Sequence, residues 1–156
     1  MTVKAIPNGY HSVTPYLIVD GAAGAIDYYT RAFNATELMR FPGPDGRVVH
    51  AELQIGNSRI MLGDARPDMG QRDPKSIGGS ATGLMIYVED VDRVFMQAIE
   101  AGGNVREAVK DQFYGDRSGS LVDPFGHMWT ISTHVEDVTD DEMRRRMERM
   151  SHATQS

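Results

Sequence analysis

The chain has 156 residues, of which 40% are hydrophobic and 24% are charged, and its formal net charge is −6. This length and composition are typical of one globular unit, and the negative charge argues against a partner such as nucleic acid or an anionic membrane surface. The sequence contains no cysteine, which excludes disulfides, thiolate metal sites and cysteine nucleophiles. No apolar run reaches the roughly 20 residues of a membrane helix, and the segment 1–11 lacks the pattern of a secretory signal, so we expect a cytoplasmic protein.

The first half of the chain has the pattern of a strand, a helix and three further strands. Residues 14–19 are apolar and predict a short strand. Apolar residues then recur at helical spacing over 22–33, and Asn34 is suited to end that helix in the left-handed conformation. Three further strands are predicted, with a Pro- and Gly-rich turn at 42–46 and a hairpin turn at Gly56-Asn57; they cover 37–41, 47–55 and 59–62.

The same order returns in the second half, after a segment rich in Gly and Pro. Residues 65–82 predict a linker or mobile loop, which can also act as a lid. Asp90 is suited to cap a helix that follows the strand 84–88 and ends at Gly102-Gly103. Aligning Val19 with Val88 also aligns Ile26 with Phe95. The chain therefore predicts two copies of a βαβββ module, over 10–64 and 83–136.

A short amphipathic helix is predicted within 137–151. Thr139 and Glu142 have the spacing of a capping box, and Met143, Met147 and Met150 share one helical face. Two interpretations stay open: the helix packs on its own domain, or it contacts a second subunit.

Several motifs together resemble a known superfamily. They are Pro15-Tyr16-Leu17, His50-Ala51-Glu52-Leu53, Tyr114-Gly115-Asp116-Arg117, and Asp123-Pro124-Phe125-Gly126-His127 with Trp129. The chain is similar to the vicinal oxygen chelate superfamily, which includes glyoxalase I, extradiol dioxygenases and bleomycin-resistance proteins, and within it to the PhnB-like branch. The resemblance implies an α+β fold in which each βαβββ sheet curves around a cup and carries its helix on the other side. It also implies a homodimer.

The resemblance further implies where a metal would lie. In metal-dependent relatives the first and last strand of each module supply four ligands, usually His and Glu. The matching positions here are Thr14, Ile60, Gly83 and Thr130. None offers an imidazole or a carboxylate, and the neighbouring residues do not supply one either. We therefore expect no metal at the usual place and no other cofactor.

His50 and Glu52 are the candidate catalytic residues. Strand alternation predicts that Val49, Ala51 and Leu53 pack under the helix while His50 and Glu52 face the cup. A neighbouring carboxylate favours a charged imidazole, which suits His50 to donate or shuttle protons. The alternative is a solvated strand face with a mutual hydrogen bond. Of the other histidines, we expect His127 to be a surface turn residue and His134 to pair with a nearby acid.

The same alternation predicts a cup lined by apolar, sulfur-containing and aromatic side chains with a few polar groups. The predicted substrate-binding residues are Tyr16, Met85, Tyr87, Tyr114, Arg117 and Thr130. Such a lining suits a metabolite-sized ligand, and Arg117 is suited to receive a carboxylate or phosphate. The alternative is that Met and Tyr fill a small closed core and that Arg117 pairs with Asp116 or Asp123.

Three functional hypotheses follow. The leading one is a protein of the glyoxalase/bleomycin-resistance type that binds a small molecule in its cup without the usual metal. The second is a metal-dependent lyase, isomerase or dioxygenase of that superfamily, with a displaced metal site built on His50 and Glu52. The third is a structural partner subunit with a filled cup. Metal content and ligand binding discriminate between them.

Overall fold

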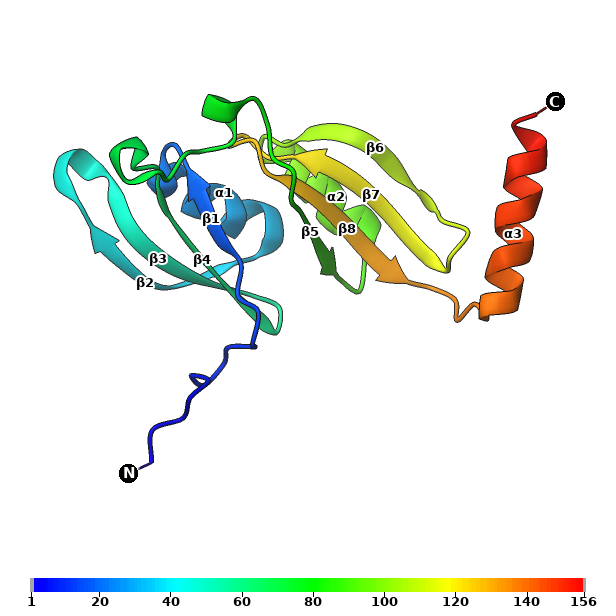
Figure 1. Cartoon of the computed structure of the whole chain (residues 1–156), viewed down its shortest axis with the longest axis horizontal. Helices are drawn as coiled ribbons and strands as arrows, with labels where there is room; N and C mark the ends of the chain where they lie inside the picture. The colour runs from blue at the N-terminus through cyan, green and yellow to red at the C-terminus, as the bar shows by residue number, and fades with distance from the viewer. Residues whose placement is uncertain (1, 156) are drawn as a thin grey trace.

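The computed structural model describes residues 2–155, and the duplicated α+β architecture expected from the sequence is confirmed (Figure 1). The first module contains β1 (Tyr16–Val19), α1 (Ala22–Phe33), β2 (Thr36–Pro42), β3 (Val48–Ile55) and β4 (Ser58–Asp64). The second contains β5 (Gly83–Tyr87), α2 (Val91–Glu100), β6 (Asn104–Asp111), β7 (Asp116–Val122) and β8 (Met128–His134). The helix α3 (Asp140–Ala153) follows.

Each module forms one mixed sheet with the same topology. The strand order is β1-β4-β3-β2 in the first sheet and β5-β8-β7-β6 in the second. The first strand of each module runs parallel to the last, and the other neighbours are antiparallel. The helix connects the first strand to the opposite edge of its sheet, so β1 and β5 are edge strands whose remaining backbone groups pair with no strand of these sheets.

The two sheets share one hydrophobic core on their helix-bearing sides. α1 packs against α2, and Trp129 of β8 reaches across to α1, where its ring lies 4.6 Å from that of Phe33 and 5.3 Å from that of Tyr29. Leu53 of the first sheet and Leu121 of the second are both fully buried in this core. The opposite face of each sheet, called here its outer face, therefore points away from the shared core.

The ends of the helices confirm two capping signals of the sequence and show a third cap, which comes from a residue far away along the chain. Asn34 ends α1 in the left-handed conformation, and the Asp90 side chain accepts a hydrogen bond from Arg93 N at the start of α2, as expected. The residue that precedes α1 is Gly21, which has no side chain to cap the helix. Asp64 at the end of β4 accepts hydrogen bonds from Gly21 N at 2.7 Å, Ala22 N at 2.9 Å and Val48 N at 2.7 Å.

The hydrogen-bonded carboxylate of Asp64 should make the stability of the protein depend on pH. Burial acts to raise the pKa of Asp64, but the three backbone hydrogen bonds outweigh it and hold the pKa below its ordinary value. The stabilisation is therefore complete above pH ~4, the range of an unfolded carboxyl group, and is lost as the pH falls through the lower folded pKa. We expect Asp64→Asn to lower the free energy of unfolding by about 2 kcal/mol at pH 7, because the amide presents a donor to a backbone N–H.

Urea unfolding of the wild type and Asp64→Asn between pH 7 and pH 2 tests this expectation. The difference should stay constant down to about pH 5 and shrink below pH ~4. Asp68→Asn, in an exposed turn, is the control and should change little at any pH. A wild-type advantage that persists unchanged at pH 2 contradicts the assignment.

A β-bulge changes which side chains at the start of β3 are buried, compared with the prediction. The pairing of β2 with β3 shifts between Phe41 and Pro42, so one extra residue of β3 lies between paired positions. Val48 is consequently buried, whereas Val49 is 40% exposed. The expectation that Val49 packs under the helix is wrong, while Ala51 and Leu53 are buried as predicted.

His127 also differs from expectation, because it is not a surface turn residue. It is only 7% exposed, and its Nε2 donates to the carbonyl oxygen of Ile18 in β1 at 2.9 Å. The physical reason is that the β7–β8 turn docks against the first module. This docking is reinforced by Asp123, which accepts hydrogen bonds from Tyr29 of α1 and from Trp129.

The connector 65–82 is structured in part. It contains 3-10 turns at Pro67–Met69 and Lys75–Ile77 and an isolated bridge between Arg66 and Gln71. Asp73 within it is buried, and its side chain accepts a hydrogen bond from Ser76 N. The segment thus lies along the two modules as a folded strap (Figure 1).

The helix α3 extends from the second module instead of packing on it (Figure 1). Thr139 caps it by accepting from Glu142 N, as the capping signal predicts. No residue of α3 is buried, and Met147 and Met150 are more than half exposed. Arg146 ties the helix to the body by bonding Glu136 and the Phe113 carbonyl oxygen. Packing on its own domain is therefore wrong, and contact with a second subunit stays a prediction.

Across residues 2–155, no helix has both the length and the apolar character that crossing a membrane would need.

Candidate functional site

Three side chains form a hydrogen-bonded chain on the outer face of the first sheet. The Tyr16 hydroxyl lies 3.1 Å from His50 Nδ1, and His50 Nε2 lies 3.4 Å from Glu52 Oε2. Since a carboxylate only accepts, Nε2 donates to Glu52, and in the neutral ring Nδ1 accepts from the Tyr16 hydroxyl. The arrangement can move a proton between a bound molecule and Glu52 by way of the imidazole. The predicted proximity of His50 and Glu52 is therefore present, with Tyr16 as a third member.

A glycine allows Tyr16 to reach His50. β4 lies between β1 and β3, so the Tyr16 side chain must pass over it. The residue at the crossing is Gly63, where an added Cβ would lie 3.1 Å from the Tyr16 hydroxyl and 2.6 Å from the Val49 carbonyl oxygen. The contact between Tyr16 and His50 thus depends on a missing side chain in a third strand.

A second polar network lies on the outer face of the second sheet, around a residue that the sequence did not single out as a site. Asp116 is buried and accepts from Tyr87 at 3.0 Å, from Ser132 at 3.2 Å and from His134 Nδ1 at 2.7 Å. Burial acts to raise the pKa of Asp116, but these hydrogen bonds lower it overall. The hydrogen bond to Asp116 raises the pKa of Tyr87 in turn.

His134 is held between two carboxylates. Its Nδ1 faces Asp116 and its Nε2 lies 2.8 Å from Asp137. Because both carboxylates accept, this arrangement favours the imidazolium form, in which both ring nitrogens donate. The hydrogen bond to Asp116, followed by that to Asp137, raises the pKa of His134 accordingly. The expected pairing of His134 with an acid is confirmed.

Arg117 does not line the cup, which corrects its predicted role. Its guanidinium makes two hydrogen bonds of 2.9 Å to Asp92 on α2 and one of 3.2 Å to Asp111. Alternation along β7 is the reason, since Asp116 points to the outer face and Arg117 to the helix-bearing face. Pairing with Asp116 or Asp123 is wrong as well.

The other predicted binding residues lie on or beside the outer faces. Tyr16 is 45%, Met85 49% and Tyr87 63% exposed, so these side chains do not fill a closed core. Thr130 pairs with Met85 in the second sheet. Tyr114 lies in the β6–β7 turn, close enough to Tyr87 to contribute to its raised pKa. Tyr16 thus belongs to one outer face, and Met85, Tyr87 and Thr130 belong to the other.

One of the four predicted metal-ligand positions is wrong by one residue along the sequence. Ile60 is buried in the core, and the β4 residue that pairs with Tyr16, as Thr130 pairs with Met85, is Met61. Neither Met61 nor Thr130 offers an anionic oxygen. Within residues 2–155 no three His, Asp or Glu side chains are grouped as a metal ion would require, and His50 and Glu52 already bond one another. The residues present do not fit the superfamily's metal, and its absence from the protein stays a prediction.

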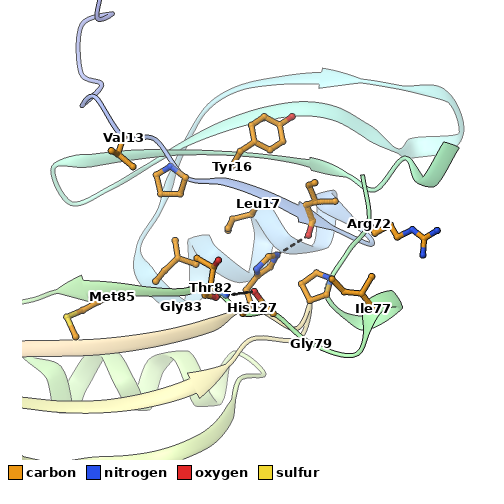
Figure 2. A pocket seen from close by; sticks show the side chains of 16 residues that line it. Val13, Tyr16, Leu17, Arg72, Ile77, Gly79, Thr82, Gly83, Met85 and His127 are labelled. Atoms are coloured by element: carbon orange, nitrogen blue, oxygen red, sulfur yellow. Dashed lines mark hydrogen bonds between the residues drawn. The ribbon is translucent and has the colours of Figure 1, made fainter. Parts of the chain in front are cut away.

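A cavity of about 540 Å³ separates the free edges of β1 and β5 (Figure 2). The connector closes one side of it and His127 forms part of its floor. The lining is mainly apolar and consists of Val13, Pro15, Tyr16, Leu17, Ile18, Arg72, Pro74, Ile77, Gly79, Ser80, Ala81, Thr82, Gly83, Leu84, Met85 and His127. Figure 2 shows Tyr16 and Met85 leaving β1 and β5 in opposite directions.

Comparisons with known proteins agree with this architecture. The chain is 44% identical over 139 residues to the Mycobacterium bovis protein Mb0911c, covering 87% of this chain and 91% of that protein. Two solved structures have a similar fold. TioX from Micromonospora sp. ML1 has a TM-score of 0.61 and 24% identity, covering 83% of this chain and 100% of TioX. The PhnB protein of Bacillus cereus has a TM-score of 0.62 and 19% identity, covering 79% and 99% of the two chains.

A family model also matches most of the sequence. The model of the Glyoxalase/Bleomycin resistance protein/Dioxygenase superfamily aligns with residues 9–131, which include both βαβββ modules apart from the end of β8. With two repeated sheets, uncovered outer faces and this match, the chain belongs to the glyoxalase/bleomycin resistance protein/dioxygenase superfamily.

Proposed function

We propose that this protein binds a small molecule on its outer sheet faces, without the metal that many members of the superfamily use. The observation that carries the proposal is the combination on these faces of exposed aromatic and Met side chains with ordered polar groups. Tyr16, His50 and Glu52 supply one wall, and Met85, Tyr87 and Thr130 supply the other, with Tyr114 at its edge. Such surfaces take a mixed apolar and polar ligand.

We further propose a homodimer and membership of the PhnB-like branch. The two outer faces of one chain point away from its shared core, so a closed cup requires the first sheet of one copy opposite the second sheet of another. The exposed side chains of Phe41 and Val49 on the first sheet and Met85 and Tyr87 on the second support such an interface. The fold similarity to the PhnB protein supports the branch.

An enzymatic function is the second candidate, and one observation favours it. The Tyr16–His50–Glu52 chain has the connectivity of a proton relay, with a hydroxyl at the end that a ligand can reach. A lyase, isomerase or dioxygenase that used a displaced metal would take its ligands from His50 and Glu52, at the cost of their mutual hydrogen bond.

Metal analysis separates the two candidates. Protein purified without a His-tag and incubated with Zn, Ni, Mn or Fe should retain no stoichiometric metal after dialysis. Stoichiometric metal that is lost in His50→Ala contradicts the metal-free proposal and supports the enzyme. Light scattering should give the mass of a dimer, and a monomer at all concentrations contradicts the shared cup.

Ligand binding is tested with a matched pair of methionine variants. We expect compounds that raise the melting temperature of the wild type to bind Met85→Ala at least 5-fold more weakly, because truncation removes part of the apolar wall. Met96 on α2 is similarly exposed but lies away from the outer faces, so Met96→Ala should bind normally. Equal losses in both variants, or no stabilising compound in a broad metabolite library, contradicts the binding proposal and favours a structural subunit.

A further inference from the structure

His127 has one ring nitrogen without a partner. Its Nε2 donates to the Ile18 carbonyl oxygen, and its backbone N–H is bonded to Asp123. No group in residues 2–155 makes a hydrogen bond to Nδ1. Since Ile18 can only accept, Nε2 carries the hydrogen, and in the neutral ring Nδ1 has a free lone pair. More than nine-tenths of His127 is buried, and the residue lines the cavity between β1 and β5.

The surroundings of this acceptor have the size and chemistry of a ligand site. His127 lines the cavity between β1 and β5, whose volume of about 540 Å³ lies within the roughly 300–1,000 Å³ typical of small-molecule sites. Leu17, Leu84, Pro74 and Ile77 contribute apolar surface to the walls. An unpartnered acceptor on a mostly buried side chain that lines a mainly apolar cavity favours a ligand that supplies a hydrogen-bond donor.

The charges around the cavity define the ligand further. Besides Tyr16 and His127, the only ionisable lining residue is Arg72, and Figure 2 shows its guanidinium extended away from His127. No carboxylate lines the cavity. A charged group next to His127 would therefore lose its hydration without gaining an ionic partner.

We propose that the cavity between β1 and β5 is a second binding site, which takes an uncharged, mainly apolar alcohol or phenol whose hydroxyl donates to His127 Nδ1. This site shares Tyr16 and Met85 with the outer faces of the proposed function but differs from them in its hydrogen-bonding residue. It lies between the edges of β1 and β5, and its hydrogen-bonding residue, His127, comes from the β7–β8 turn.

Three related probes test the proposed chemistry by calorimetric titration of the full chain. 2-Naphthol offers the hydroxyl, 2-methoxynaphthalene has the same ring system without a donor, and 2-naphthoate carries a charge. We expect 2-naphthol to bind the wild type at least 10-fold more tightly than either of the others, with a change in the Nδ1 chemical shift of His127. Equal affinities for the naphthol and its ether overturn the proposal, as does tightest binding of the naphthoate.

Variants locate the site. His127→Phe should bind 2-naphthol and its ether equally, whereas His152→Phe, at an exposed position of α3, should keep the preference. Because His127→Phe also removes the bond to Ile18, Gly83→Leu provides a second test: a Cβ there meets no atom within 4 Å, and the side chain narrows the cavity. Gly83→Leu should weaken the binding of naphthol and ether alike by at least 10-fold, and unchanged binding contradicts the location.

A further variant distinguishes this site from the outer faces. Tyr87→Ala changes the second outer face but no residue that lines the cavity, so 2-naphthol should bind it as it binds the wild type. Loss of binding in Tyr87→Ala overturns the proposed site and assigns the probe to the outer face. Met85 belongs to the second outer face and also lines the cavity, so Tyr87→Ala separates the two proposals: it should weaken ligands of the outer face and leave the binding of 2-naphthol unchanged.

Discussion

Replacing Asp123 by alanine is expected to lower the free energy of unfolding by about 3–5 kcal/mol. Asp123 is only 2% exposed. One of its oxygens accepts from Phe125 N at 2.8 Å and His127 N at 3.0 Å, and the other accepts from Tyr29 at 2.5 Å and Trp129 Nε1 at 2.9 Å. Alanine leaves several of these donors buried without an acceptor, and the penalty for each is large.

Thermal unfolding measures this effect. We expect the melting temperature of Asp123→Ala to fall by about 10 °C for a chain of this size. Asp68→Ala, at an exposed turn position, should shift the melting temperature by less than 2 °C. Tyr29→Phe removes one donor only and should cost about 1–2 kcal/mol. Because Tyr29 and Asp123 bond one another, the double variant should be more stable than the sum of the two losses indicates. A decrease of less than 1 kcal/mol in Asp123→Ala would show that water replaces the carboxylate.

Gly115→Ala is expected to destabilise the protein by about 3 kcal/mol. Gly115 has a φ of +100°, which an L side chain rarely adopts, and an added Cβ would overlap the Glu136 carbonyl oxygen. Its own carbonyl oxygen accepts from Val135 N and Glu136 N. The backbone would have to move apart, and these two hydrogen bonds would be weakened.

Gly70→Ala separates backbone strain from steric overlap. Gly70 also has a positive φ, +76°, but an added Cβ there meets nothing within 4 Å. It should therefore cost only the conformational strain, about 1 kcal/mol. Urea unfolding curves of both variants give the comparison. Equal losses in the two would indicate that the segment at Glu136 shifts freely, and that the overlap contributes nothing.

The repeated modules could be predicted from sequence because each local signal agrees with the next. Helical spacing, the left-handed Asn34 and the Asp90 cap act over a few residues, and strand alternation fixed the outer position of Tyr16 and Met85. These features depend on neighbours along the chain, so one sequence is enough to find them.

The errors arose where a residue's environment comes from distant segments. The bulge in β3 reversed the predicted orientation of Val49, and a one-residue slip placed Ile60 where Met61 belongs. His127 is buried by a strand more than 100 residues away in the sequence, as its bond to Ile18 shows. No local pattern carries that information.

For the same reason, the sequence predicted only part of the candidate site. His50 and Glu52 are two residues apart in one strand, so alternation predicted their contact. Tyr16 joins them only because Gly63, in another strand, leaves room for its ring. The Asp116 network unites three strands of the second sheet. The only part of this network predicted from the sequence was the pairing of His134 with a nearby acid.

The single core shared by both halves has a consequence for synthesis on the ribosome. Tyr29 and Asp123 bond across 94 residues of sequence, and Phe33 is covered by Trp129. A nascent chain that has emerged only as far as β4 therefore exposes the apolar surface of α1 to solvent or to a chaperone. The second module buries this surface only after it has been translated. The synthesis of the last strands therefore determines when the first module becomes protected from aggregation.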